Sequence, residues 1–295
     1  MKKALVTGSE GFVGQHLKTE LERQDYLVVT YNLRHGNDIR DKEKLRNFLD
    51  IERPDFIFHL AAQAYVPESF ADPIRTFEVN VFGTLHLLDA VRQLGLKPKI
   101  HIAGSSEEYG PAAPNVHGDT QPSSPYAVSK LAADKLAQIY SEVYGMDIVV
   151  TRAFNHTGPG RGEMYAESSF AKQIAEIEKG KRKFLEHGNL DSIRNYTDVR
   201  DVVKAYILAV NATPGVYNIC SETNISIGVM LNKLADLSHE EISHNSVHSA
   251  DRDRPNDFDF LKPRCDAFRA ETGWRPEIPF EQTLSDLLDY WRKRV

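Results

Sequence analysis

Ala4-Leu-Val-Thr-Gly8-Ser-Glu-Gly11-Phe-Val-Gly14 joins a short apolar run to a glycine-rich turn near the start of the chain. The apolar run predicts a buried strand, and the pattern after Gly14, through Leu17 and Leu21 to Gln24, predicts a helix. Glycines let a backbone turn tightly and approach a pyrophosphate, which then rests on the positive end of the helix. The first glycine interval departs from the G-x-G-x-x-G fingerprint, so the position between strand and helix carries the inference. Five residues are expected to contact a dinucleotide: Gly8, Gly11, Phe12, Val13 and Gly14.

Strands and helices continue to alternate through the first half of the chain. Further strands are predicted at Tyr26–Tyr31, Pro54–Leu60, Lys99–Ala103 and Asp147–Arg152. Helices are predicted at Asp41–Leu49, at Phe77–Leu94 and around Tyr126. Strands separated by helices of this length form right-handed crossovers in a parallel sheet that is covered on both faces. We therefore predict an α/β fold with a doubly wound parallel Rossmann sheet, whose ligands bind beyond the carboxyl ends of its strands.

Beyond about residue 155 the alternation of predicted strands and helices becomes less regular. Helices are predicted at Ser168–Lys179, Val199–Val210, Ile227–Leu237 and Phe280–Arg292, and a strand at Gly215–Cys220. We expect residues 1–155, with interleaved later segments, to form the dinucleotide-binding domain. Residues 156–295 are expected to form mainly a smaller mixed α/β cap that binds the substrate. No Pro/Ser/Gly-rich linker separates the two parts, which is why we expect them to interleave.

Composition and charge limit the kinds of partner. The 295-residue chain is 41% hydrophobic and 26% charged, as in ordinary globular proteins. Its net charge of −6 argues against a nucleic-acid-binding surface. No apolar run is long enough for a membrane span, and the first residues enter a strand directly, so we expect a cytoplasmic protein. Cys220 and Cys265 are too few for a disulfide framework and lack metal-ligand spacing, so no metal is expected.

The end of the second predicted strand bears on the choice of cofactor. A carboxylate about twenty residues after the glycines would favour NAD(H), because it accepts hydrogen bonds from the adenosine ribose. Asn32 occupies that place and Arg34 follows it, which would suit a 2′-phosphate. We therefore expect NADP(H) to be preferred, with NAD(H) possible. Asp38 and Ile39 either contact the adenine or begin the following helix.

Tyr126 and Lys130 lie four residues apart in a predicted helix, and residues at this spacing share one helix face. A phenol with a pKa of about 10 is a poor proton donor or acceptor at neutral pH. A neighbouring ammonium group would lower that pKa and make the tyrosine a usable general acid or base. The same spacing is also typical of a solvated helix face, so the pair needs support from other residues.

That support comes from several segments that occur in order: the glycine loop, His59-Leu-Ala-Ala-Gln63, Gly104-Ser-Ser-Glu-Glu-Tyr-Gly110 and Tyr126-x-x-x-Lys130. With them the chain resembles the extended short-chain dehydrogenase/reductase family over nearly its whole length. The resemblance implies that Ser105, Tyr126 and Lys130 are catalytic, with Ser106 as a neighbouring candidate. Ser105 would hold the substrate oxygen, Tyr126 would transfer the proton, and Lys130 would bind the nicotinamide ribose. Further cofactor contacts are implied for Leu60, Ala61, Ala62 and Asn80.

Within that family the chain is most similar to the nucleotide-sugar branch. The similarity lies in Arg152-Ala-Phe-Asn-His-Thr-Gly-Pro-Gly160, Gly188-Asn-Leu and Arg254-Pro255. It implies that a 4-keto-6-deoxy sugar linked to GDP is reduced, giving a GDP-rhamnose-type product. Substrate contacts are implied for Ser106, Glu107, Asn155, Arg194 and Arg254. A planar guanidinium suits a pyrophosphate, but Asn195 replaces the family's usual aspartate, which leaves the sugar and base open.

Glu107 supports a second interpretation. Related 4,6-dehydratases place a glutamate here to shuttle protons during loss of water, a group that a reductase does not require. A dehydratase of GDP-mannose or another sugar nucleotide therefore remains an alternative, as does a 4-epimerase. A dinucleotide-binding sensor without chemistry is the remaining class, although such proteins lose the tyrosine or the lysine. By resemblance, Phe77–Leu94 and Tyr126–Tyr144 are also expected to pair into a four-helix homodimer interface.

Overall fold

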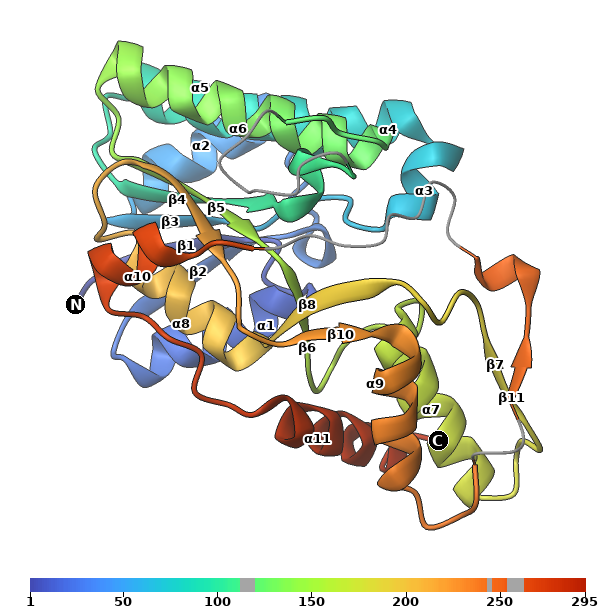
Figure 1. The fold of residues 1–295 in the computed structure, drawn as a ribbon. Coiled ribbons are helices and arrows are strands. Elements are labelled where there is room, and N and C mark those ends of the chain that lie inside the picture. The colour runs from blue at the N-terminus through green and yellow to red at the C-terminus, as the bar shows by residue number, and fades with distance from the viewer. Residues whose placement is uncertain (112–119, 243–245, 254–262) are drawn as a thin grey trace.

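The computed structural model describes residues 1–111, 120–242, 246–253 and 263–295. A six-stranded parallel sheet forms its centre (Figure 1). In spatial order its strands are β2 (Leu27–Tyr31), β1 (Lys3–Thr7), β3 (Phe56–His59), β4 (Lys99–Ser105), β5 (Ile148–Ala153) and β9 (Gly215–Ile219). The order reverses at β1, and in such sheets the crevice beyond the carboxyl ends at the reversal is where ligands bind. The predicted α/β fold with a parallel Rossmann-like sheet is confirmed.

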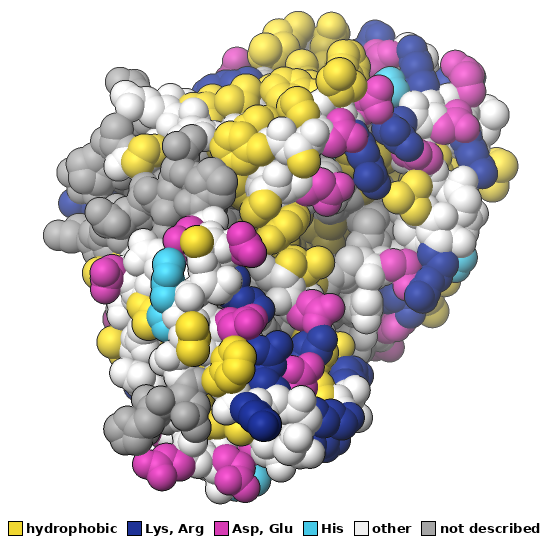
Figure 2. All heavy atoms as spheres, turned by 90° about the vertical axis from the view of Figure 1, so that its right-hand side faces the viewer, with side chains coloured by type: hydrophobic (Ala, Val, Ile, Leu, Met, Phe, Trp, Pro, Cys, Tyr) yellow, Lys and Arg dark blue, Asp and Glu magenta, His cyan; other side chains and the backbone are white. Residues whose placement is uncertain are grey.

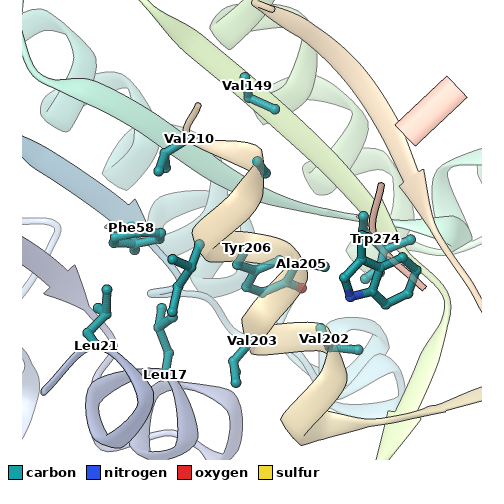
Figure 3. Close-up of a cluster of buried hydrophobic side chains, with 14 of the residues drawn as sticks. Leu17, Leu21, Phe58, Val149, Val202, Val203, Ala205, Tyr206, Val210 and Trp274 are labelled. Carbon is teal, nitrogen blue, oxygen red and sulfur yellow. The ribbon is translucent and has the colours of Figure 1, made fainter. Parts of the chain in front are cut away.

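Helices cover both faces of this sheet. On one face, α1 (Phe12–Arg23) packs against α8 (Val199–Ala209). Figure 3 shows Val203 and Tyr206 of α8 in one buried cluster with Leu17 of α1 and Phe58 of β3. On the other face lie α2 (Lys42–Glu52), α5 (Gly83–Gln93) and α6 (Pro125–Tyr144). These buried apolar faces anchor the strand ends that carry the candidate site.

The helix predicted at Phe77–Leu94 is wrong in detail. The chain forms α3 (Val66–Ala71), α4 (Pro73–Phe77), a π-helical turn η2 (Glu78–Phe82) and then α5. At the junction Gly83 lies against Ile39, since a Cβ there would come within 2.7 Å of the Ile39 side chain. Single π-helical turns are frequent at functional sites, and this one contains Asn80.

The described residues of the later part of the chain form two small sheets and a separate helical layer. One sheet has the order β10 (Asn224–Ser226), β8 (Ile193–Asp198) and β6 (Asn155–Thr157), and the other pairs β11 (Ser246–His248) with β7 (Leu185–His187). A separate core joins α7 (Ala166–Glu178), α9 (Ile227–Asp236) and α11 (Phe280–Arg292). Strand β9 and helix α8 come from this part of the sequence but pack in the central layers.

Cys220 and Cys265 are joined as a disulfide between the end of β9 and the residue before α10 (Asp266–Thr272). Two cysteines separated by 45 residues carry no pairing signal, so the sequence did not predict this contact. Among the described residues, no helix is both long and apolar enough to span a membrane. The same residues contain no group of three or more histidine, cysteine or acidic side chains that could hold a metal ion.

Candidate active site

A cavity of about 660 Å³ opens beside the carboxyl ends of β4 and β5. Its walls come from η3 (Ser106–Tyr109), the start of α6, β6, the start of α7, the end of β7 and the first half of β8. The cavity brings together six side chains that the sequence singled out: Ser105, Ser106, Glu107, Tyr126, Asn155 and Arg194. Arg254, the remaining predicted substrate contact, lies outside the described residues.

The glycine loop connects β1 to α1 at the crevice of the central sheet. Gly8 has a φ of +69°, and a Cβ there would come within 2.8 Å of the Ala61 nitrogen. A Cβ on Gly14 would collide with the carbonyl oxygen of Gly8. Gly11 precedes α1 and has no side chain that could cap the first-turn N–H groups. These close approaches and the uncapped, positive helix end fit a dinucleotide pyrophosphate.

The end of β3 is held beside this loop by Thr7. Its hydroxyl oxygen accepts hydrogen bonds from the backbone nitrogens of Leu60 at 3.2 Å and Ala61 at 3.1 Å. Nδ1 of His59 lies 2.8 Å from the same oxygen. Burial lowers the pKa of His59 to about 3, so the ring stays neutral and serves this network. Leu60 and Ala61 are thus positioned next to the glycines, as the predicted cofactor contacts require, and Ala62 follows them.

The residues after β2 make contacts that the sequence did not indicate. Asn32 is buried, with Nδ2 donating to Ser9 Oγ at 2.9 Å and Oδ1 accepting from the backbone of His35. Arg34, in η1 (Leu33–His35), is 76% exposed at its side chain and forms an ion pair with Glu10 of the glycine loop at 2.9 Å. The guanidinium group therefore lies at the edge of the loop, open to solvent.

Asp38 and Ile39 have separate roles in this structure. The Arg40 guanidinium lies 2.7 Å from the Asp38 carboxylate and lowers the pKa of that group. Ile39 is buried and packs in the core formed with α2 and α5. Its side chain is therefore part of the protein interior.

Ser105, Tyr126 and Lys130 come together where β4 meets α6. Ser124 caps α6, and Tyr126 and Lys130 follow on one face of the helix, as predicted. The Ser105 and Tyr126 side chains both line the cavity, and the interaction with Ser105 acts to lower the pKa of Tyr126. Lys130 is buried behind them and donates a hydrogen bond from Nζ to the carbonyl oxygen of Ala103 at 2.7 Å.

The predicted direction of the Tyr126 pKa is wrong for this structure. Burial raises the pKa of Tyr126, and this effect exceeds the lowering by the interaction with Ser105. Burial likewise lowers the pKa of Lys130 to about 8. The sequence shows the spacing of the two groups, but it does not show that both lose contact with water, which penalises their charged forms.

Asn80 links the cofactor side of the site to α6. Its Nδ2 donates to the Gln63 carbonyl oxygen at 3.0 Å and to Ser129 Oγ at 2.9 Å. Its Oδ1 accepts from the Gln63 nitrogen at 2.8 Å. The predicted cofactor residue therefore fixes the loop after β3 against the helix that carries Tyr126.

Two cavity-lining arginines were missed by the sequence reasoning. The Arg161 guanidinium lies 3.4 Å from the ring centre of Tyr165 and 5.0 Å from that of Phe12 at the start of α1. Arg252 donates to Ser169 Oγ and to the Glu186 carboxylate, both at 3.0 Å. Arg161 follows a Gly-Pro-Gly turn, a signal for a loop near the site, but only the fold shows that its side chain enters the cavity.

Comparisons with known proteins agree with this geometry. A protein-family profile described as GDP-mannose 4,6 dehydratase matches residues 5–287. GDP-6-deoxy-D-mannose reductase of Pseudomonas aeruginosa is 35% identical over 100% of this chain and 98% of its own. GDP-mannose 4,6 dehydratase 1 of Arabidopsis thaliana is 32% identical over 86% of this chain and 73% of its own.

Solved structures show the same fold. The structure of RMD from Pseudomonas aeruginosa complexed with NADPH has a TM-score of 0.91 at 34% identity, covering 100% of both chains. UDP-glucose 4-epimerase of Thermus thermophilus, complexed with NAD, has a TM-score of 0.86 at 28% identity, covering 99% of this chain and 100% of its own. The similarity therefore includes reductases, dehydratases and epimerases that act on sugar nucleotides.

Proposed function

Because this chain belongs to the GDP-mannose 4,6-dehydratase-like extended short-chain dehydrogenase/reductase family, we propose that it is an NAD(P)H-dependent reductase of a nucleotide-linked 4-keto-6-deoxy sugar. The proposed reaction converts GDP-4-keto-6-deoxy-D-mannose to GDP-D-rhamnose. The observation that carries the proposal is the Ser105–Tyr126 pair on the wall of a cavity large enough for a sugar nucleotide, with Lys130 directly behind it. The full-length similarity to a GDP-6-deoxy-D-mannose reductase supports this substrate class.

The proton chemistry follows from the environment of Tyr126. The phenol is protonated at neutral pH, which is the form needed to donate a proton to a ketone oxygen, although burial alone makes it a weaker acid than an ordinary tyrosine. Ser105 donates a hydrogen bond to the same oxygen and holds it beside the phenol. The buried ammonium of Lys130 stabilises the phenolate as it forms. When bound, the cofactor supplies the reducing equivalent to the sugar carbon.

The cofactor is proposed to be NADPH, with NADH as a weaker substitute. The pyrophosphate would rest on Gly8, Gly11 and Gly14 at the start of α1, where the close backbone approaches leave room for it. Arg34 lies at the edge of that loop, where its side chain is exposed and paired with Glu10. Its guanidinium can release Glu10 and bind a 2′-phosphate instead, while it stays exposed to solvent. A similar solved structure contains NADPH, and another contains NAD.

The sugar nucleotide is proposed to lie between the central sheet and the later part of the chain. Asn155, at the start of β6, would contact the sugar, and Arg194 would bind the diphosphate. Arg161 adds a guanidinium group that the sequence did not indicate. Such groups bind phosphate oxygens through paired hydrogen bonds, so this wall of the cavity is suited to a dianionic linker.

Tyr126→Phe tests this assignment. The variant should lose turnover of the keto sugar while its affinity for NADPH, measured by fluorescence titration, stays within about twofold of the wild-type value. Turnover that survives the substitution would contradict the proton-donor role.

Glu107 supports the dehydratase as a second candidate function, because its side chain lines the cavity next to Ser105 and Ser106. A dehydratase would use that carboxylate to move protons during loss of water, whereas the reductase has no such step. Glu107→Gln therefore separates the two functions: a reductase should keep most of its turnover, and a dehydratase should lose it.

We also propose that the protein is a cytoplasmic homodimer. Figure 2 shows hydrophobic side chains gathered along the upper part of one face, the level at which α4 and α6 lie in Figure 1. Exposed apolar residues on and next to α6 include Phe82, Val128, Ile139 and Val143. Two such faces would bury one another in a four-helix interface. Light scattering should give twice the mass of the chain, and Val143→Asp should shift the mass toward the monomer.

A further inference from the structure

Glu108 is fully buried directly behind the catalytic serine, and the proposed reaction assigns it no chemical step. Its Oε1 accepts a hydrogen bond from the backbone N–H of Ser105 at 2.7 Å. In return, Ser105 Oγ accepts from the backbone N–H of Glu107 at 3.2 Å. These two bonds form a capping box at the start of η3. They fix the backbone and the side chain of Ser105, and the serine hydroxyl hydrogen stays available for donation.

The strand before Ser105 makes room for the Glu108 carboxyl group. A Cβ on Gly104 would lie 2.9 Å from Glu108 Oε1 and 2.9 Å from the carbonyl oxygen of Thr151. Any larger residue at this position would push the carboxyl group away from the Ser105 nitrogen. The contact therefore depends on a glycine in β4 as well as on the glutamate.

Arg152 and Asp134 complete the buried network. Arg152 Nε lies 2.8 Å from Glu108 Oε2, and Arg152 Nη2 lies 2.6 Å from Asp134 Oδ2. Burial and the neighbouring Asp134 raise the pKa of Glu108 well above its ordinary value. The Arg152 guanidinium therefore faces both buried carboxyl groups, and its positive charge compensates for negative charge in this part of the interior.

The network joins three elements around the catalytic groups: η3, which follows Ser105; β5, which lies beside β4; and α6, which carries Tyr126 and Lys130. Glu108 lies in η3 next to Ser105, and Arg152 lies on β5, the strand beside β4. Asp134 lies on α6 one turn beyond Lys130, on the same helix face. Simple packing would be satisfied by an apolar side chain at position 108, and replacement of buried ionic groups by apolar ones is often neutral or stabilising. The carboxyl group adds the acceptor for the Ser105 N–H.

We propose that Glu108 is the positioning residue for Ser105: its carboxyl group holds the serine backbone so that the hydroxyl points at Tyr126 and at the substrate oxygen. This role rests on the proposed reductase function. The two neighbouring glutamates therefore have different roles. Glu107 lines the cavity, where it can meet the substrate, whereas Glu108 acts only through Ser105.

Two substitutions separate positioning from packing. Glu108→Val removes the acceptor and leaves an apolar side chain, whereas Glu108→Gln keeps an acceptor of nearly the same shape. We expect Glu108→Val to lower kcat for the keto sugar at least about tenfold, since small displacements of a catalytic group cost up to about a hundredfold. Its KM and its affinity for NADPH should stay within about twofold. Glu108→Gln should recover kcat to within about threefold of the wild-type value.

Asp201→Val is the matched control. Asp201 is also a fully buried carboxylate, and its Oδ2 accepts from the backbone nitrogens of Glu277 and Ile278 at 2.8 Å each. It lies outside the cavity, so its loss should lower the Tm and leave kcat unchanged. The proposal would be overturned if Glu108→Val had the same kcat as the wild type. It would also be overturned if Glu108→Val and Glu108→Gln lost kcat by the same factor.

Hydrogen exchange gives a readout that does not depend on turnover. The Ser105 amide should exchange slowly in the wild type and in Glu108→Gln, and faster in Glu108→Val. If the wild type reduces no keto sugar, the proposed function fails, and the Ser105 amide still shows whether Glu108 holds this segment. If Glu108→Val does not fold, Gly104→Ala displaces the same carboxyl group. It should then lower kcat by a similar factor, and an unchanged kcat in Gly104→Ala would refute the role of Glu108.

Discussion

Lys130 Nζ donates a hydrogen bond to the carbonyl oxygen of Ala103 at 2.7 Å. This bond ties α6 to β4 two residues before Ser105, so it joins the helix that carries the proton donor to the strand that carries the substrate-binding hydroxyl. The ammonium group is held in the protein interior, where burial lowers its pKa to about 8. The position of this cation therefore has consequences for stability and for activity.

Replacement of Lys130 by methionine should stabilise the protein and inactivate it. The unfolded chain holds the lysine proton up to its ordinary pKa of 10.5, and the folded chain releases it near 8. Below pH 8 this group therefore opposes folding, and the penalty fades as the pH rises toward 10.5. After the lost hydrogen bond is subtracted, we expect a gain of about 1 kcal/mol in the free energy of unfolding at pH 7. Turnover should fall at least about 100-fold.

Urea denaturation and steady-state kinetics on the same Lys130→Met sample measure both effects. A variant that is less stable and equally inactive would show that the lysine is mainly a structural element of the β4–α6 contact.

The rate of ketone reduction should depend on the protonation of Lys130. Above pH 8 the folded protein loses the ammonium proton, and the cation that stabilises the Tyr126 phenolate disappears. We expect kcat/KM to be level near neutral pH and to fall about tenfold for each pH unit once Lys130 is deprotonated. A pH–rate profile with saturating NADPH measures this, and a rate that stays level to pH 10 would rule out a role for the charge.

Arg34 should determine the preference for the phosphorylated cofactor. Arg34→Ser removes the cation at the edge of the glycine loop, so the Kd of NADPH should rise about tenfold while that of NADH stays unchanged. Arg23→Ser is the control, because it removes an equally charged side chain from the other end of α1. If Arg34→Ser weakened the binding of NADPH and NADH by the same factor, Arg34 would not be the residue that binds the 2′-phosphate.

Arg161 should act in substrate binding. Its guanidinium lies close to the Tyr165 and Phe12 rings at the cavity wall, where it can bind the diphosphate of the sugar nucleotide. Arg161→Gln should raise KM about tenfold with little change in kcat, because the interaction exists before and during the reaction. Arg182→Gln removes a cation that pairs with Glu176 outside the cavity, and it should leave both constants unchanged. A fall in kcat at constant KM would assign Arg161 to the chemical step instead.

The sequence predicted the central layers well because their signals are local. The strand from Ala4 to Thr7, the glycine turn and the apolar spacing of α1 each follow from short-range patterns, and the alternation of elements then fixes a parallel sheet. The π-helical turn at Glu78–Phe82 was missed, since one extra residue in a turn hardly changes apolar periodicity. Strands of three residues such as β7 and β11 are too short to show a period at all.

The sequence indicated which residues gather at the candidate site, but it did not indicate their pKa values. Ser105, Tyr126 and Asn155 converge on one cavity, as their motifs implied. The pKa of Tyr126 was predicted in the wrong direction because burial is a property of the whole fold. Glu108 lies inside a quoted motif and Arg161 directly follows one, but neither motif assigns them a role. The contacts of Glu108 with Arg152 and of Arg161 with Phe12 join segments that lie far apart in the chain, so the sequence did not show them.

The most direct test of the central claim is the stoichiometry of cofactor oxidation. The purified protein is mixed with NADPH and GDP-4-keto-6-deoxy-D-mannose, and in parallel with GDP-mannose alone, and both the nicotinamide absorbance and the sugar products are followed. The reductase assignment predicts one NADPH oxidised for each keto sugar consumed, and no reaction of GDP-mannose. Formation of a 4-keto product from GDP-mannose without net cofactor consumption would contradict it and identify a dehydratase.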